Sequence, residues 1–204
     1  MSYIDPIDAT RYDFDEWIRF AFDRPVAEER WYFTEELHFE CDPSIVITYY
    51  SRLFRDPVRL LSPYSEDQIE QGLWFVVSHQ LGDWLWDEDI PLPLRLDCIA
   101  AMPAMFRAFL IDHELDTSCF MWWDMLRFFG ESPDRRVLED AMIKSLEAVL
   151  QVPSRHCQMS ALHGLGHLPH EPKEAIIRGF LAANAGADDE MRTYAEHAIA
   201  GNVL

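Results

Sequence analysis

The chain has 204 residues, of which 49% are hydrophobic, and a formal net charge of −19 at pH 7. This length suits one domain or a short run of repeats, and the apolar content excludes a disordered protein. Because an acidic surface repels phosphate groups, we expect no direct nucleic-acid binding and no membrane binding. A protein partner that carries positive charge fits this composition better.

The cysteines indicate a reducing environment. They are widely spaced, without a Cys-x-x-Cys pair, and predict free, buried thiols. Residues 1–6 lack a basic stretch followed by an apolar run, and no apolar stretch reaches the ~18–20 residues that span a bilayer. We therefore expect a cytoplasmic protein. The four cysteines are Cys41, Cys98, Cys119 and Cys157.

Helix-start and helix-stop signals predict an all-α fold. Asp42 followed by a proline indicates a helix start, and this helix should stop before Asp56. Ser65 and Gln68 have the spacing of a capping box, in which two side chains bind the free amides of a helix start. Residues 31–33 are the one weak strand candidate, and they are equally compatible with a helix.

The middle of the chain predicts longer helices. A helix is expected over residues 92–115, with a kink at Pro103, whose ring removes an amide donor. An aromatic helix should follow over residues 117–129. Ser132, which precedes a proline, is then predicted to cap a helix that runs to about Leu150.

Three more helices are predicted at the C-terminal end. Ser154 should start the first, which stops before Pro169. Pro172 should begin the second, which ends at Gly186. Asp188 should cap the last helix with its carboxylate.

The C-terminal third contains an internal repeat. Residues 140–144 recur as 174–178, and residues 161–166 recur as 195–200, with the same offset of 34 (174−140 and 195−161). A fainter copy begins at Ala101, at a spacing of 40 (141−101). Fixed periods of this size mark stacked repeats, in which each unit buries its apolar face against its neighbours.

This pattern resembles HEAT-type repeats, which consist of two antiparallel helices, and the resemblance is clearest over residues 132–204. The small residues Ala141, Ala161, Ala175 and Ala195 recur where helices of such units cross closely, and Pro103 in a first helix is also typical. The resemblance implies a right-handed α-α superhelix that binds other proteins on a concave surface lined by the second helices. We divide the single domain 1–204 into a divergent N-terminal segment (residues 1–90), a weak repeat (91–130) and clearer repeats (132–168 and 169–204).

A stripe of polar residues lies on the helix that follows Ser154. Its members are spaced by four, three and four residues and therefore share one helix face. They are His156, Ser160, His163 and His167. By the offset of 34, the equivalents of His156 and His163 in the next repeat are Glu190 and His197.

Three interpretations of this stripe are open: a solvated polar face, a divalent-metal site and a pH-sensitive contact surface. His163 and His167 are spaced like two metal ligands on one helix. Neighbouring helices of a stack lie ~8–10 Å apart, so Glu190 or His197 could complete the site. Some HEAT-type hydroxylases hold iron with His-Glu pairs at corresponding positions. Here Gly164 follows the first of these histidines, so the carboxylate of that pattern is missing.

We expect a non-catalytic module that needs no cofactor and binds a protein partner on a curved acidic surface. The aromatic and acidic run over residues 84–89 could form an exposed contact loop for this partner. The candidate binding residues are His156, His163, His167, Glu190, His197, Trp84 and Trp86.

Two other functions compete with this one. The first is a metal-dependent enzyme that uses His163, His167, Glu190 and His197 as ligands of a divalent metal. The second is a self-associating structural protein, in which the aromatic segment around Trp122 forms a homodimer interface.

Overall fold

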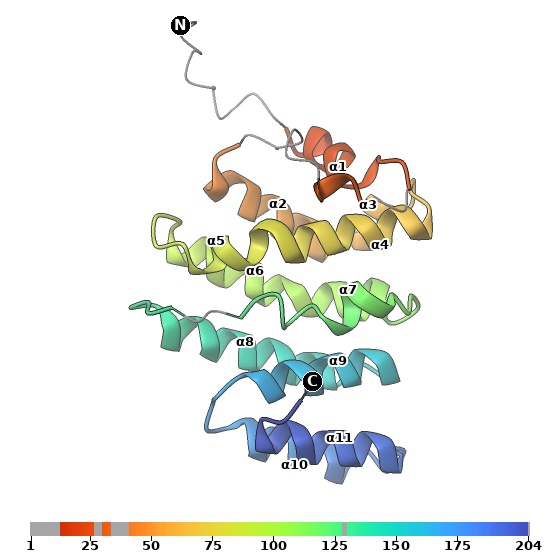
Figure 1. Ribbon diagram of the computed structural model, residues 1–204, viewed down its shortest axis with the longest axis vertical. Coiled ribbons are helices and arrows are strands. Elements are labelled where there is room, and N and C mark those ends of the chain that lie inside the picture. Colours follow the sequence, from red (N-terminus) through yellow and green to blue (C-terminus); the bar gives the residue numbers. More distant parts are fainter. Residues whose placement is uncertain (1–12, 27–29, 34–40, 128–129, 204) are drawn as a thin grey trace, which may run out of the picture.

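The computed structural model describes residues 13–26, 30–33, 41–127 and 130–203. All regular elements of these residues are helical, which confirms the predicted all-α class (Figure 1). The strand candidate Trp31–Phe33 (η1) forms a 3₁₀ turn. Residues 1–12, which include the segment searched for a signal peptide, lie outside the described ranges. Among the described helices, none combines the length and apolar character that crossing a bilayer requires.

The helices form two rows that run along the long axis of the molecule (Figure 1). Each helix packs against the next member of its own row. The first row consists of α2 (Pro43–Arg55), α6 (Leu92–Met105), α8 (Arg135–Leu150) and α10 (Lys173–Ala183). The second row consists of α4 (Glu66–Phe75), α7 (Asp116–Phe120), α9 (Arg155–His167) and α11 (Asp189–Ala200), and α1 (Phe14–Phe22) packs against α4.

The rows are cross-linked by helix pairs that follow the sequence repeat. α8 packs against α9 and α10 against α11, so the segments 132–168 and 169–204 each hold one pair. α6 and α7 lie within 91–130, and α2 and α4 extend both rows into the segment for which no repeat register was found. The right-handed superhelix remains a prediction.

Shorter elements connect these helices. α4 continues through a π-helical segment, η2 (Val76–Leu81), into α5 (Gly82–Trp86), and these three form one long rod (Figure 1). α3 (Pro57–Leu61) follows α2, and α6 continues into a second π-helical turn, η3 (Phe106–Leu110). π-Helical turns accommodate locally irregular packing without ending a helix.

Most of the predicted helix starts are confirmed. At each of them a side-chain oxygen accepts a backbone N–H of the first helical turn, which removes an unpaired donor. Ser65 and Gln68 form the complete predicted capping box. The confirmed capping residues are Asp42, Ser65, Ser154 and Asp188.

The start of α8 differs from the prediction. The helix begins at Arg135, and the Ser132 hydroxyl accepts the N–H of Asp134 before the helix starts. The Asp134 carboxylate does not cap the helix, because it lies 2.5 Å from the guanidinium of Arg95, which is only 2% exposed. Pairing a buried cation therefore takes precedence over a regular helix cap here.

The aromatic helix predicted over residues 117–129 is wrong in its length, because α7 ends at Phe120. The chain continues in turns that bury Trp122 and Trp123. Both rings pack on Phe106, Trp122 edge-on and Trp123 stacked, with centroid distances of 5.5 and 5.8 Å. Adjacent residues on a regular helix point about 100° apart, so a turn buries both indoles more readily.

Pro103 lies inside α6. The continuous helix formed by α6 and η3 ends at Leu110 rather than at the predicted residue 115. The proline has no N–H for the carbonyl of Ile99, four residues earlier. The buried hydroxyl of Ser145, on α8, donates a 2.9 Å hydrogen bond to this carbonyl instead. A side chain of the neighbouring helix thus replaces the missing backbone donor.

We predict that Ser145→Ala lowers the free energy of unfolding by about 1–3 kcal/mol, because it leaves the buried Ile99 carbonyl without this donor. In a Pro103→Ala background the restored amide can donate to the same carbonyl, so the same substitution should cost less. Urea unfolding of the wild type, both single variants and the double variant measures this difference. Equal costs in both backgrounds would contradict the proposed exchange of donors.

Candidate metal centre

α9 is enclosed by its neighbours, because α7, α8 and α11 all pack against it. His163 is 1% exposed and Ser160 is fully buried, with its hydroxyl donating a 2.7 Å hydrogen bond to the carbonyl of Cys119. The histidine stripe is therefore not the solvated polar face that was one of its interpretations. Its central residues lie inside the second row of helices.

Two of the predicted residues, His163 and His167, meet a carboxylate that comes from the turn after α7. The Nε2 atoms of the two histidines are 3.1 Å apart, and Nε2 of His167 is 3.3 Å from Oδ1 of Asp124. All three ligand atoms lie within 4.8 Å of one another. Two imidazoles and one carboxylate therefore form one cluster.

The spacing of these atoms suits a bound ion. Zinc lies about 2.0–2.1 Å from nitrogen or oxygen ligands, which places two ligands of a tetrahedral ion roughly 3.3 Å apart. The distances from His167 to His163 and to Asp124 are 3.1 and 3.3 Å and match this value. Binding of one ion also requires the distance between the ligand atoms of His163 and Asp124 to reach this value.

Tyr194, on α11, orients the ring of His163. Its hydroxyl oxygen lies 2.7 Å from Nδ1 of His163, and the ring of Phe120 packs 4.5 Å from the imidazole, centroid to centroid. When Nδ1–H donates to Tyr194, Nε2 carries no proton and presents a lone pair to the other two ligands. Metal-binding histidines are commonly fixed by such a hydrogen bond at the second nitrogen.

Burial of the cluster favours neutral histidines. Burial lowers the pKa of His163 to about 4, and neighbouring His167 contributes in the same direction. Burial also lowers the pKa of His167. Neutral imidazole is the form that binds metal ions. Burial raises the pKa of Tyr194 to about 12, so it keeps its hydroxyl proton at neutral pH.

Gly164 allows the segment that holds Asp124 to approach α9. A Cβ atom on this glycine would lie 2.7 Å from Cβ and Cγ of Trp123 and 2.7 Å from a methyl group of Leu146. Only glycine leaves room for this contact. Gly164, which stands where the iron-binding HEAT pattern has a carboxylate residue, thus packs against Trp123. Asp124, the next residue after Trp123, supplies a carboxylate from another element.

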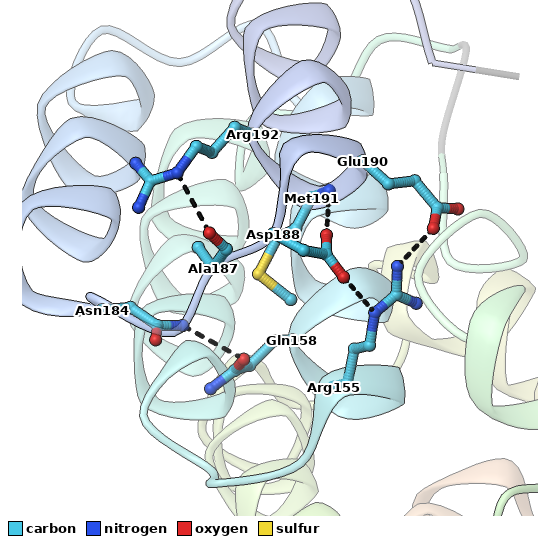
Figure 2. Close-up of polar contacts among 8 residues, drawn as sticks. All are labelled: Arg155, Gln158, Asn184, Ala187, Asp188, Glu190, Met191 and Arg192. Atoms are coloured by element: carbon cyan, nitrogen blue, oxygen red, sulfur yellow. Dashed lines mark hydrogen bonds and ion pairs between the residues drawn. The ribbon is translucent and has the colours of Figure 1, made fainter.

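The other predicted ligands lie elsewhere. Glu190 and His197 are exposed, and neither belongs to the cluster around His163. Figure 2 shows Glu190 paired with Arg155 at 2.6 Å, while Asp188 lies 3.2 Å from the same guanidinium. The predicted four-residue ligand set is therefore wrong in Glu190 and His197.

The remaining candidate binding residues have other neighbours. His156 contacts the Leu110 carbonyl and the Ser154 hydroxyl through its ring nitrogens. Trp84 is half-buried and stacks on Tyr50. Trp86 is 6% exposed, so the run 84–89 does not present this indole to solvent.

Trp86 instead supports the site. Its indole N–H donates a 3.0 Å hydrogen bond to the carbonyl of Leu126, two residues after Asp124. Arg127 also holds this segment, because its guanidinium lies 3.1 Å from Oδ1 of Asp124. A cavity of about 320 Å³ adjoins the site and is lined by His167, Trp86, Arg127 and both charged and apolar residues of α8.

Sequence reasoning missed Asp124. It lies on a turn 39 residues before His163 (163−124), outside the repeat and within a segment predicted to be helical. Tyr194 was missed as well, although its place in the repeat carried a signal. By the offset of 34 it corresponds to Ser160 (194−160), a member of the stripe, and both hydroxyls bind the helix or segment that precedes them in the row.

We predict that the protein loses stability in mild acid. The pKa of His163 is about 4 in the folded protein and 6.5 ordinarily, so between these values the unfolded chain binds the extra proton. The free energy of unfolding should therefore fall as the pH drops through this window, by about 2 kcal/mol from about pH 7.5 to pH 5. Asp124, His167, Arg127 and Tyr194 are the titratable groups around it.

Urea unfolding at both pH values, with a chelator present, measures this loss. His163→Asn should remove that part of the pH dependence, whereas His197→Asn, at the exposed equivalent position, should keep it. An unchanged pH dependence in His163→Asn would contradict the assignment.

No protein-family model matches the chain, and searches of curated proteins and of solved structures find no match either. The resemblance of residues 132–204 to HEAT-type repeats therefore remains a prediction from the sequence. The function has to be inferred from the chemistry of Asp124, His163 and His167.

Proposed function

We propose that this protein binds one divalent transition-metal ion through Asp124, His163 and His167, and that this ion is the centre of its activity. The convergence of the three side chains carries the proposal. They come from two elements, the distances from His167 to the other two fit one ion, and the histidines are neutral at neutral pH. The proposal keeps the metal-dependent alternative of the sequence analysis and changes its ligand set.

Within the part of the chain that the structure describes, the cluster has three ligands, and their kind and number favour a reactive site over a structural one. Structural zinc sites are closed by four protein ligands, whereas catalytic sites keep three and leave a position for water or substrate. Two histidines and one carboxylate also form the set that binds non-haem Fe(II). The cavity beside His167 offers the space for an additional ligand. A bound ion would polarise that ligand as a Lewis acid.

The elements around the cluster hold its ligands in place before an ion binds. Tyr194 fixes the ring of His163, and Arg127 fixes the carboxylate of Asp124. Such outer partners typically change metal affinity by 10–100-fold when they are removed. The cluster is thus a preorganised site, in which little side-chain freedom has to be lost on binding.

We expect about one zinc, iron or manganese ion per chain in tag-free protein purified without chelator. Elemental mass spectrometry measures the metal content directly. His163→Ala and Asp124→Asn should each lose most of the ion, because two ligands hold it far less tightly than three. His197→Ala is the matched control, since it removes an exposed histidine from the equivalent position of the next repeat and should leave the metal content unchanged.

A second readout separates a lost ion from a lost fold. Because it binds the folded state alone, the ion should stabilise the wild type by about 2.7 kcal/mol at a hundred times its Kd and so raise its thermal midpoint. His163→Ala should fold, as seen by circular dichroism, without any shift on addition of zinc. Wild-type protein that neither contains metal nor takes it up would refute the proposal.

Recognition of a basic protein partner is our second proposal, and the ion pairs of the last repeats favour it. Arg155 lies between Asp188 and Glu190, and Arg178 lies between Glu174 and Glu196. Each of these exposed cations is thus matched by two carboxylates. The surface keeps its acid excess after pairing, which agrees with a net charge of −19.

This proposal predicts a complex whose affinity falls steeply with salt, because exposed charges are screened beyond about 10 Å at 0.1 M ionic strength. Affinity purification from extract at low and high salt, followed by a titration of the isolated partner, tests it. Charge reversal at Glu174 and Glu196 should weaken binding, whereas Glu174→Gln alone should have a smaller effect. A partner that binds equally well at high salt would contradict an electrostatic interface.

A further inference from the structure

The cavity next to the candidate metal centre carries two arginines in a strongly acidic protein. Arg127 and Arg135 line it, and their side chains keep 33% and 37% of their surface exposed. Each already contacts one carboxylate, Arg127 that of Asp124 and Arg135 that of Glu139. Both guanidinium groups are thus held in place, and both side chains remain partly exposed.

The local charge is unlike that of the whole chain. The formal charges of Arg127, Arg135, Asp124 and Glu139 sum to zero (2−2), in a protein of net charge −19. A divalent ion between Asp124 and the histidines would raise this local sum to +2. In a low-dielectric site such a charge favours an anionic ligand, and it excludes a cationic one.

The rest of the cavity wall is largely apolar. Trp86, Met142 and Leu146 line it and are at most 6% exposed to solvent. Its volume of about 320 Å³ lies at the lower end of the range for ligand pockets, which is about 300–1,000 Å³. A ligand that fills it is therefore small and buries an apolar body against these side chains.

His167 connects the cavity to the metal cluster. It is a wall residue of the cavity, and its Nε2 atom is part of the metal cluster. A group beside His167 can reach the ion, and Met142 and Leu146 of α8 offer apolar surface in the same cavity. We infer that the cavity binds a small organic anion, a carboxylate with an apolar body, whose charged group lies between the metal ion and the two arginines.

This inference rests on the proposed metal site, and its test separates the two. Protein loaded with zinc is titrated in a calorimeter with phenylacetate, benzoate and hexanoate. Each carboxylate is compared with its neutral amide, and benzylamine serves as the cation. At least one carboxylate should bind ten times more tightly than its amide, since hydrogen bonds to a charged acceptor are about twice as strong as neutral ones. Benzylamine should not bind.

Arg135→Gln should weaken binding of that carboxylate about tenfold while zinc affinity stays within a factor of two, because Arg135 pairs with Glu139, which is not a proposed metal ligand. Arg178→Gln is the matched control. Arg178 pairs with Glu174 four residues before it on a helix, as Arg135 pairs with Glu139 four residues after it, but it lies on the surface. Its substitution should leave both affinities unchanged.

The outcomes are distinct. If zinc does not bind, the proposed function fails. If zinc binds and all carboxylates bind no better than their amides, or benzylamine binds, the ligand class is wrong although the metal site stands. If zinc-free protein binds the carboxylate as tightly as the loaded protein, the ligand does not reach the ion, and this inference is overturned.

Discussion

The contact between Gly164 and Trp123 sets the distance between α9 and the turn that follows α7, and the candidate centre depends on that distance. Because no Cβ separates them, the turn lies directly on α9, where Asp124 reaches His167. The same close packing removes His163 from water and keeps it neutral. Sterics, burial and charge thus favour one arrangement, in which two neutral imidazoles face a carboxylate that Arg127 holds.

Patterns that act within one helix were predictable from the sequence. Ser65 with Gln68, and Asp188 before the last helix, signal caps because a cap involves residues two or three positions apart. Predictions of helix starts and ends failed where a contact with a residue far away in the sequence takes precedence over the local pattern. Ser132 does not cap α8, since Asp134 is drawn to buried Arg95, and the segment after Phe120 leaves the helix to bury two adjacent indoles.

The same distinction explains what could be known of the site. His163 and His167 were predictable because two ligands four residues apart on one helix are visible as a spacing. Glu190 and His197 followed from the repeat offset, which gives equivalent positions and not the direction of a side chain. They are exposed, and Glu190 binds Arg155. Asp124 lies on a turn, where no periodicity marks a residue as facing a helix that comes later in the chain.

The chain of polar contacts from Tyr194 through His163 and His167 to Asp124 joins the three successive segments 91–130, 132–168 and 169–204. In stacked repeats, stability is approximately a sum of terms between nearest neighbours, so single units at the end of a stack can fray. Here the segment 91–130 is linked to the segment 169–204 through His163 and His167, which belong to the segment between them. Breaking or strengthening these contacts would therefore change how cooperatively the whole C-terminal half unfolds. Fraying of α11 would release the ring of His163.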